Sequence, residues 1–291
     1  MKFLGLLITT LWLLIPATSW CYDLLIVQSQ RSPAYDDVLR GLHSEARFSE
    51  RVIVLTDYNE IDLVRIARED HPTAIVTLGD KALAAARKVR QTPIIALMAL
   101  TYRAGMGGHP AMTGVEVQPG PERYLPLFVS LKARKVGVIS AADRSTAYIK
   151  HARKLAVEFG IDLVVREVKS SRDVAAQLDS LAGQIDALWM LPDNITASGK
   201  AADAHFHFSA GHKIPVIVFS SAYLASGAAL ALDIDRFDIG KQGGEMAAAL
   251  ITGNGISEIA PQTPHKTSIK SNPHVLRRLG LSPQSSSRNS E

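Results

Sequence analysis

The chain alternates short apolar runs with segments of helical spacing, and this alternation passes through the sequence twice. The runs Ala187–Leu191 and Pro215–Phe219, for example, are apolar at consecutive positions, and each is followed by small polar residues that begin a helical pattern. Strands that are apolar on both faces are typical of a parallel sheet covered by helices on both sides. The pattern therefore predicts an α/β protein with doubly wound parallel sheets.

Nine apolar runs are expected to form strands. They are Leu24–Val27, Arg51–Leu55, Ala74–Leu78, Ile94–Leu97, Val136–Ile139, Ile161–Val165, Ala187–Leu191, Val216–Phe219 and Ala229–Leu232. A first series covers about residues 22–113, and a second begins at Lys135. Proline and glycine crowd residues 114–121 between the two series, where a helix cannot continue, so we expect a domain boundary there.

The first 21 residues have the composition of a secretory signal peptide. Lys2 is followed by an uncharged, mostly apolar stretch at 3–15, and small residues at 17–19 offer a cleavage site. This stretch is too short to span a bilayer, so we expect an exported chain. Cys21 is the only cysteine in the sequence, which excludes an intramolecular disulfide. Trp20 stands where a lipoprotein signal has a small residue, so we expect no lipid anchor at Cys21.

Composition excludes several other classes of protein. Charged residues make up 21% and aromatic residues 6%, which is ordinary for a globular protein, and the remaining length suits two domains. The net charge of +4 is small and dispersed, which argues against nucleic acid as a partner. Residues 282–291 are too polar to bury a core, and we expect a disordered tail there.

Signatures of catalysis and of cofactor binding fail on inspection. Gly-x-Ser-x-Gly is absent, Gly199-Lys200-Ala201 lacks the other residues of a phosphate-binding loop, and Pro110 stands where a dinucleotide motif needs its last glycine. We therefore expect no catalytic residues, no enzymatic activity and no cofactor. Three histidines suggest a metal site, but no carboxylate or cysteine completes a convincing set, and we expect them on a solvated helix face without metal. They are His205, His207 and His212.

Polar residues that follow the predicted strands are the candidate ligand contacts, because open α/β sheets bind ligands at the carboxyl ends of their strands. In the first series these are Ser29, Gln30, Ser32, Tyr35, Gly79, Asp80, Thr101 and Tyr102, and in the second they are Ser140, Ser145, Thr146, Asp193, Asn194, Ser220 and Ser221. The hydroxyl and carboxylate residues can instead cap helices or form turns, and the tyrosines can pack in the core. Asp193 is the sharpest case, since its carboxylate can cap the next helix or accept an ammonium group from a ligand.

Several short motifs occur in the order found in a known family. They are Thr113-Gly114-Val115, Lys135-Val136-Gly137-Val138, Asp186-Ala187, Pro192-Asp193-Asn194, Ile214-Pro215-Val216, Gly227-Ala228 and the segment from Asp235 to Gly253. By these motifs the chain resembles the substrate-binding proteins of ABC transporters, in the uncharacterised-transporter group with the type I periplasmic binding protein fold. The resemblance implies two flavodoxin-like lobes that are joined by three crossings and enclose a small polar ligand, such as an amino acid.

The same resemblance implies where the lobes divide. Residues 22–116 and 234–262 would form the N-terminal lobe, with a helix at Asp238–Ile251 returning to it, and residues 117–233 and 263–281 would form the C-terminal lobe. The hinge would lie at Glu116–Pro119, Ile234–Arg236 and Gln262–Pro264. Hinge closure around a ligand is the motion expected of such lobes.

The resemblance also implies a periplasmic protein that delivers its ligand to an ABC permease in the inner membrane. Thr101-Tyr102-Arg103 stands where many members have an Asp-Pro pair, and Asp80 stands where members often have a small hydroxyl residue. The identity of the ligand therefore does not carry over. A second interpretation stays open, in which the lobes sense a ligand and signal to a membrane receptor, kinase or cyclase.

Overall fold

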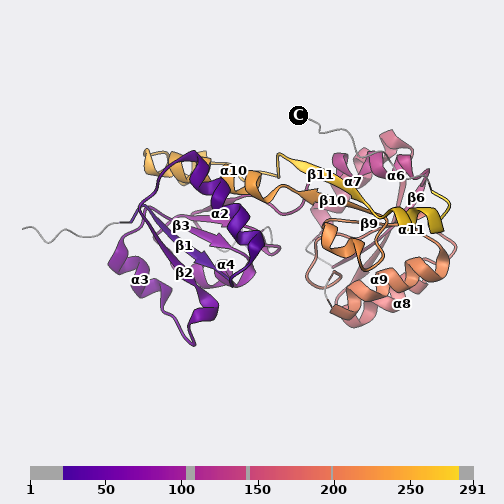
Figure 1. The fold of residues 1–291 in the computed structure, drawn as a ribbon, viewed down its shortest axis with the longest axis horizontal. Helices are drawn as coiled ribbons and strands as arrows, with labels where there is room; N and C mark the ends of the chain where they lie inside the picture. The colour runs from indigo at the N-terminus through magenta and orange to yellow at the C-terminus, as the bar shows by residue number, and fades with distance from the viewer. Residues whose placement is uncertain (1–21, 103–108, 142–144, 198, 282–291) are drawn as a thin grey trace, which may run out of the picture.

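The computed structural model describes residues 22–102, 109–141, 145–197 and 199–281 (Figure 1). Two lobes lie along the long axis of the molecule, and each contains one sheet with helices against both of its faces. The predicted signal peptide at 1–21, Cys21 included, and the predicted tail at 282–291 lie outside the described residues.

The first lobe is built on five parallel strands in the order β2-β1-β3-β4-β5. They are β1 (Leu24–Gln28), β2 (Glu50–Val54), β3 (Ala74–Leu78), β4 (Ile94–Leu97) and β5 (Met112–Gly114). Helices α3 (Leu63–Asp70) and α4 (Asp80–Ala86) cover one face, and α2 (Pro33–Glu45) and α10 (Arg236–Ile251) cover the other. Every residue of β1 and β3 is buried, as two-sided coverage by helices requires.

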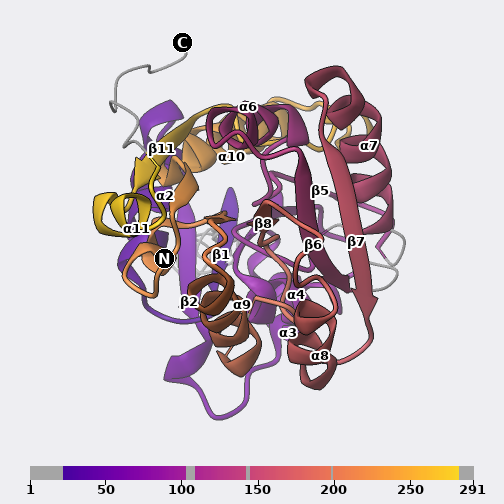
Figure 2. The same cartoon turned by 90° about the vertical axis from the view of Figure 1, so that its right-hand side faces the viewer.

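The second lobe is built on six strands in the order β11-β10-β9-β8-β6-β7. They are β6 (Lys135–Ala141), β7 (Asp162–Val168), β8 (Ala187–Trp189), β9 (Val216–Val218), β10 (Leu230–Ile234) and β11 (Thr267–Ser271). Helices α6 (Leu125–Ser130), α7 (Thr146–Ala156) and α11 (Pro273–Arg278) pack on one face, and α8 (Val174–Asp179) and α9 (Gly199–His212) pack on the other (Figure 2). Short 3-10 turns lie at η2 (Leu55–Asp57), η4 (Pro121–Arg123), η5 (Val157–Phe159), η6 (Ser171–Asp173), η7 (Ser221–Leu224) and η8 (Ile256–Glu258).

Each of the nine predicted apolar runs overlaps a strand, and the predicted α/β class with two sheets is confirmed. The sequence pattern missed β5, which has only three residues, and β11, whose residues are partly or fully exposed. β11 also pairs antiparallel with β10, so the second sheet is not wholly parallel. Helix α10 begins at Arg236, two residues before the predicted start, because the Asp235 carboxylate caps it by accepting from the Asp238 N–H at 3.1 Å.

Three crossings connect the sheets and run side by side. The first follows β5, the second joins β10 to α10, and the third leads from η8 to β11. The Glu116 N–H donates to the Gln262 carbonyl at 2.9 Å, which ties the first crossing to the third. The Asp235 N–H donates to the Lys266 carbonyl at 3.1 Å, which ties the second to the third. The exact lobe boundaries stay a prediction. Rotation of the lobes about these crossings also stays a prediction.

Glycines allow α10 to pack closely against α2 although the two helices are far apart in sequence. A Cβ atom on Gly240 would lie 1.8 Å from the Val38 carbonyl oxygen, and one on Gly41 would lie 1.9 Å from the Phe237 carbonyl oxygen. Larger residues at these positions would therefore force the helix backbones apart. This contact fixes the helix that follows β10 to the opposite lobe.

The three histidines do not all lie on a solvated face, which corrects the expectation for His205. His207 and His212 are exposed, but His205 is fully buried and its Nδ1 lies 2.8 Å from the Ala201 carbonyl oxygen. Burial lowers the pKa of His205, and the backbone hydrogen bond opposes that shift. Within the described ranges, no group of three potential ligands could hold a metal ion, and no helix is long and apolar enough to span a membrane.

Candidate ligand-binding cleft

A cavity lies between the lobes at the carboxyl ends of β4 and β8 and beside the start of α7. It has about 530 Å³ of empty space, including the part that is open to solvent. The first lobe contributes Ala99, Leu100 and Tyr102, the first crossing contributes Glu116, Val117 and Gln118, and the second lobe contributes Ser145, Pro192, Asp193 and Asn194. Residues of both lobes and of the first crossing therefore line the same cavity.

The loop that follows β4 forms the first lobe's side of the cavity. Met98 adopts a left-handed backbone conformation with φ of 55°, which is uncommon for a residue other than glycine. The Asp80 carboxylate accepts the Thr101 N–H at 2.7 Å and the Thr101 hydroxyl at 2.6 Å. Asp80 and Thr101 thus hold the loop that presents the buried Tyr102 to the cavity.

The other predicted residues of the first lobe lie around the starts of α2 and α4. The Ser29 hydroxyl accepts from the Ala82 N–H at 2.9 Å, and the Ser32 side chain caps α2 by accepting from the Ala34 N–H at 3.3 Å. Both serines therefore have the capping role that the sequence left open. Gln30 is exposed.

The Tyr35 hydroxyl lies over Gly79. A Cβ atom on Gly79 would lie 2.1 Å from that hydroxyl, and Gly79 has a φ of 90°, so the position requires glycine. Burial raises the pKa of Tyr35, a hydrogen bond with Ser29 lowers it, and the charge of Asp80 raises it. The ligand contacts predicted for these first-lobe residues stay predictions.

Asp193 is held by backbone groups on both sides of its carboxylate. Oδ1 accepts from the N–H groups of Ile195 at 2.7 Å and Thr196 at 3.2 Å, and Oδ2 accepts from the N–H of Ala141 at 3.3 Å. The carboxylate therefore shapes its own loop and joins that loop to the end of β6. Asp193 is 5% exposed and lines the cavity, next to the exposed Asn194.

The remaining second-lobe residues divide between the cavity and other environments. Ser145 lines the cavity at the start of α7, where its side chain accepts no capping hydrogen bond. Thr146, next to it, is exposed, and Ser140 is buried within β6. Their predicted contact with a ligand stays a prediction.

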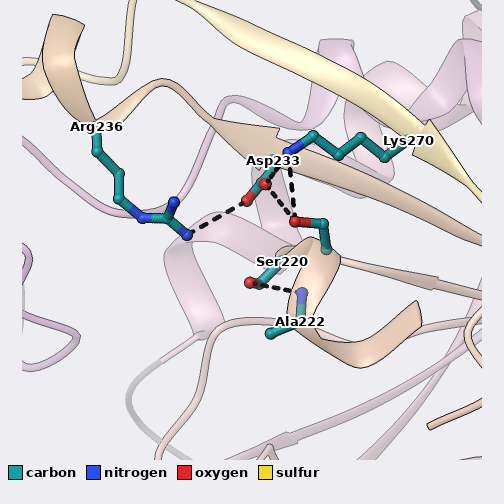
Figure 3. Close-up of polar contacts among 6 residues, drawn as sticks. Ser220, Ala222, Asp233, Arg236 and Lys270 are labelled. Carbon is teal, nitrogen blue, oxygen red and sulfur yellow. Dashed lines mark hydrogen bonds and ion pairs between the residues drawn. The ribbon is translucent and has the colours of Figure 1, made fainter. Parts of the chain in front are cut away.

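Ser220 and Ser221, which follow β9, both have hydrogen-bond partners within the second lobe (Figure 3). The Ser220 side chain caps η7, and the Ser221 hydroxyl donates to Asp233 Oδ2 at 2.6 Å. Asp233 is almost fully buried, and it also accepts from Lys270 Nζ at 2.9 Å and lies 4.0 Å from the Arg236 guanidinium. This polar cluster joins residues from β10, η7, β11 and the second crossing.

Four of the residues predicted from the sequence line the cavity, namely Tyr102, Ser145, Asp193 and Asn194. Sequence reasoning missed Glu116 and Gln118 as site residues, because they were assigned to a linker and hinge. The sequence does carry a signal for them. The connection between the two lobes is rich in proline and glycine, and a carboxylate and an amide stand out in it.

Comparison with known families identifies the class of protein. The family model described as "ABC transporter substrate binding protein" matches residues 67–286. The chain belongs to this family. A curated substrate-binding relative, the tyrosine-binding protein of Clostridioides difficile strain R20291, is 27% identical over 152 residues. That match covers 52% of this chain and 44% of the relative, so it spans less than half of the relative's length.

Solved structures confirm the type I periplasmic binding protein fold of this family member. A Streptococcus pneumoniae ABC domain in complex with L-Trp has a TM-score of 0.66 at 15% identity, with coverage of 91% of this chain and 96% of that one. A ligand-free, open substrate-binding protein with adhesive properties from Clostridium difficile has a TM-score of 0.70 at 20% identity, with coverage of 92% and 97%. A conserved domain protein from Vibrio cholerae has a TM-score of 0.64 at 21% identity, with coverage of 90% and 95%.

Proposed function

We propose that this substrate-binding protein is exported to the periplasm and serves an ABC importer by enclosing an amino acid between its lobes. The observation that carries the proposal is the cavity, which is bounded by both lobes and by the first crossing. Rotation of the lobes about the crossings would close such a cavity around a ligand. Membership in the transporter family supports delivery to a permease.

The lining of the cavity suits an aromatic amino acid. Ala99, Leu100, Val117 and Pro192 supply apolar surface beside the Tyr102 ring, and a few carboxylate, amide and hydroxyl groups interrupt that surface. Apolar pockets with a small number of convergent polar groups are typical of small-molecule sites. A tyrosine-binding relative and a structural neighbour with bound L-Trp support the same ligand class.

Thermal unfolding in the presence of a ligand panel tests this proposal. L-tyrosine, L-tryptophan, L-phenylalanine, glucose and citrate would each be added to the protein without its first 21 residues. An amino acid present at 100 times its Kd should stabilise the folded state by about 2.7 kcal/mol, while glucose and citrate should have no effect. If none of the aromatic amino acids raises the Tm and calorimetry confirms that none binds, the proposed ligand class is wrong. Loss of uptake of the bound amino acid in cells that lack the protein would support the importer role.

A further inference from the structure

The cavity between the lobes has no lysine or arginine among its described lining residues. Arg236 and Lys270, which lie near the second and third crossings, are directed toward the buried Asp233 (Figure 3). A carboxylate group of a ligand would therefore have to be bound in the described part of the cavity by uncharged donors, such as amide side chains and backbone N–H groups.

Gln118 of the first crossing supplies such a donor. Its side chain lines the cavity, and its Nε2 atom is buried and has no hydrogen-bond partner among the residues that the structure describes. A buried donor without an acceptor costs free energy, and nearly all buried donors in folded proteins are paired. An acceptor oxygen that enters the cavity would therefore gain a hydrogen bond that the protein does not already make.

The backbone on both sides of Gln118 is fixed by its neighbours. Before it, the Glu116 N–H donates to the Gln262 carbonyl of the third crossing at 2.9 Å. After it, the Pro119 carbonyl accepts from the buried Tyr148 hydroxyl of α7 at 2.9 Å. Proline at 119 also restricts the preceding residue to an extended backbone. Gln118 is thus presented by a supported segment, which is what a binding residue needs.

The start of α7 lies beside the same cavity and favours a negatively charged acceptor over a neutral one. Ser145, the residue before the helix, lines the cavity, and its side chain accepts no capping hydrogen bond. The first turn of α7 also contains no acidic residue. The first N–H groups of a helix lack acceptors within the helix, and the helix dipole favours negative charge at this end. A carboxylate bound to Gln118 would therefore gain from the nearby helix.

We propose that Gln118 Nε2 donates a hydrogen bond to the carboxylate of the ligand and thereby selects ligands that carry this group. This inference rests on the proposed function and names a specificity-determining residue of the same site. The ligand would then bind to the first crossing as well as to the lobes. An aromatic amine that lacks the carboxylate would not gain from Gln118.

Calorimetry with three related probes tests the role of Gln118. L-tyrosine has both charged groups, 3-(4-hydroxyphenyl)propionate keeps only the carboxylate, and tyramine keeps only the amine. Gln118→Met keeps the approximate size of the side chain and removes its donor. In this variant the Kd for L-tyrosine and for the propionate should rise by about tenfold to a hundredfold, because a hydrogen bond to a charged group is lost, while the Kd for tyramine should not change. Gln118→Glu should weaken both carboxylate probes further, because like charges repel, and should not weaken tyramine. If L-tryptophan gives the larger rise in Tm, then L-tryptophan, indole-3-propionate and tryptamine replace the three probes.

Gln91→Met is the matched control, since Gln91 is an exposed residue that precedes β4 and does not line the cavity. It should leave the affinity for all three probes unchanged. Unchanged affinity of Gln118→Met for L-tyrosine, or an equal loss for all three probes, would overturn the inference, while the substrate-binding role would stand. Where tyramine binds too weakly to measure, the two variants decide the question, because Gln118→Glu that binds the propionate as tightly as Gln118→Met would also overturn it. Wild-type protein that binds none of the probes and no amino acid in the thermal panel would instead contradict the proposed function.

Discussion

Replacing Gly240 with alanine is expected to destabilise the first lobe by about 2–3 kcal/mol. The new methyl group would lie 1.8 Å from the Val38 carbonyl oxygen, and backbone atoms cannot move aside as a flexible side chain can. Overpacking of this kind outweighs the gain of up to about 1 kcal/mol that alanine brings to a helix interior. The Tm of the first lobe should fall by roughly 5–10 °C.

Gly211→Ala is the matched control, because Gly211 also lies in a helix and a Cβ atom there would meet nothing within 4 Å. It should leave stability unchanged or raise it slightly. Trp189, in the second lobe, is the only tryptophan after residue 21, so its fluorescence reports unfolding of that lobe. Circular dichroism should show the loss in Gly240→Ala, with a smaller change in Trp189 fluorescence. A Tm equal to that of Gly211→Ala would contradict the close packing of α2 and α10.

Removing the Asp193 carboxylate is expected to destabilise the second lobe by about 2–4 kcal/mol. Asp193→Ala would leave three backbone N–H groups without their acceptor, and each unsatisfied buried donor costs about 1–3 kcal/mol before water enters. Asp193→Asn should cost less, because its Oδ1 still accepts from Ile195 and Thr196 and only the Ala141 contact is lost. Denaturant unfolding followed by Trp189 fluorescence measures both losses.

Asp203→Ala serves as the control, since Asp203 is exposed on α9, and it should change stability by no more than about 0.5 kcal/mol. Ligand affinity of Asp193→Ala should fall similarly for probes with and without an amine, because the loss displaces the loop that carries Asn194. An Asp193→Ala protein as stable as wild type, but defective only toward amines, would make Asp193 the ammonium receptor.

The fold could be predicted because its main signals are local. Strands such as β1 and β3 are buried on both faces, and their continuous apolar runs show this in the sequence. The antiparallel edge strand β11 could not be found in this way, because its residues are mostly exposed and it pairs with β10, more than thirty residues earlier in the chain. The predicted start of α10 was two residues late, since Asp235 is the cap of the helix and Asp238 already lies in its first turn.

The candidate site was predictable in position but not in composition. Strand ends mark the site, and Tyr102, Ser145, Asp193 and Asn194 line the cavity at or near such ends. Hydroxyl and carboxylate groups at strand ends also cap helices, however, and only tertiary contacts separate the two roles. Ser221 donates to Asp233, a residue twelve positions away, and Asp80 accepts from Thr101 at a separation of twenty-one. Glu116 enters the cavity because a crossing passes there, which depends on the arrangement of both lobes.

Small-angle scattering with and without a bound amino acid tests most directly whether the lobes close on a ligand. L-tyrosine would be used first, or whichever amino acid gives the largest rise in Tm. A ligand shifts an equilibrium between open and closed states only as far as its affinities for the two states differ. We predict that the radius of gyration falls at saturating ligand while circular dichroism shows no change within either lobe. Identical scattering profiles, with binding confirmed by calorimetry in the same samples, would contradict enclosure of the ligand by hinge closure.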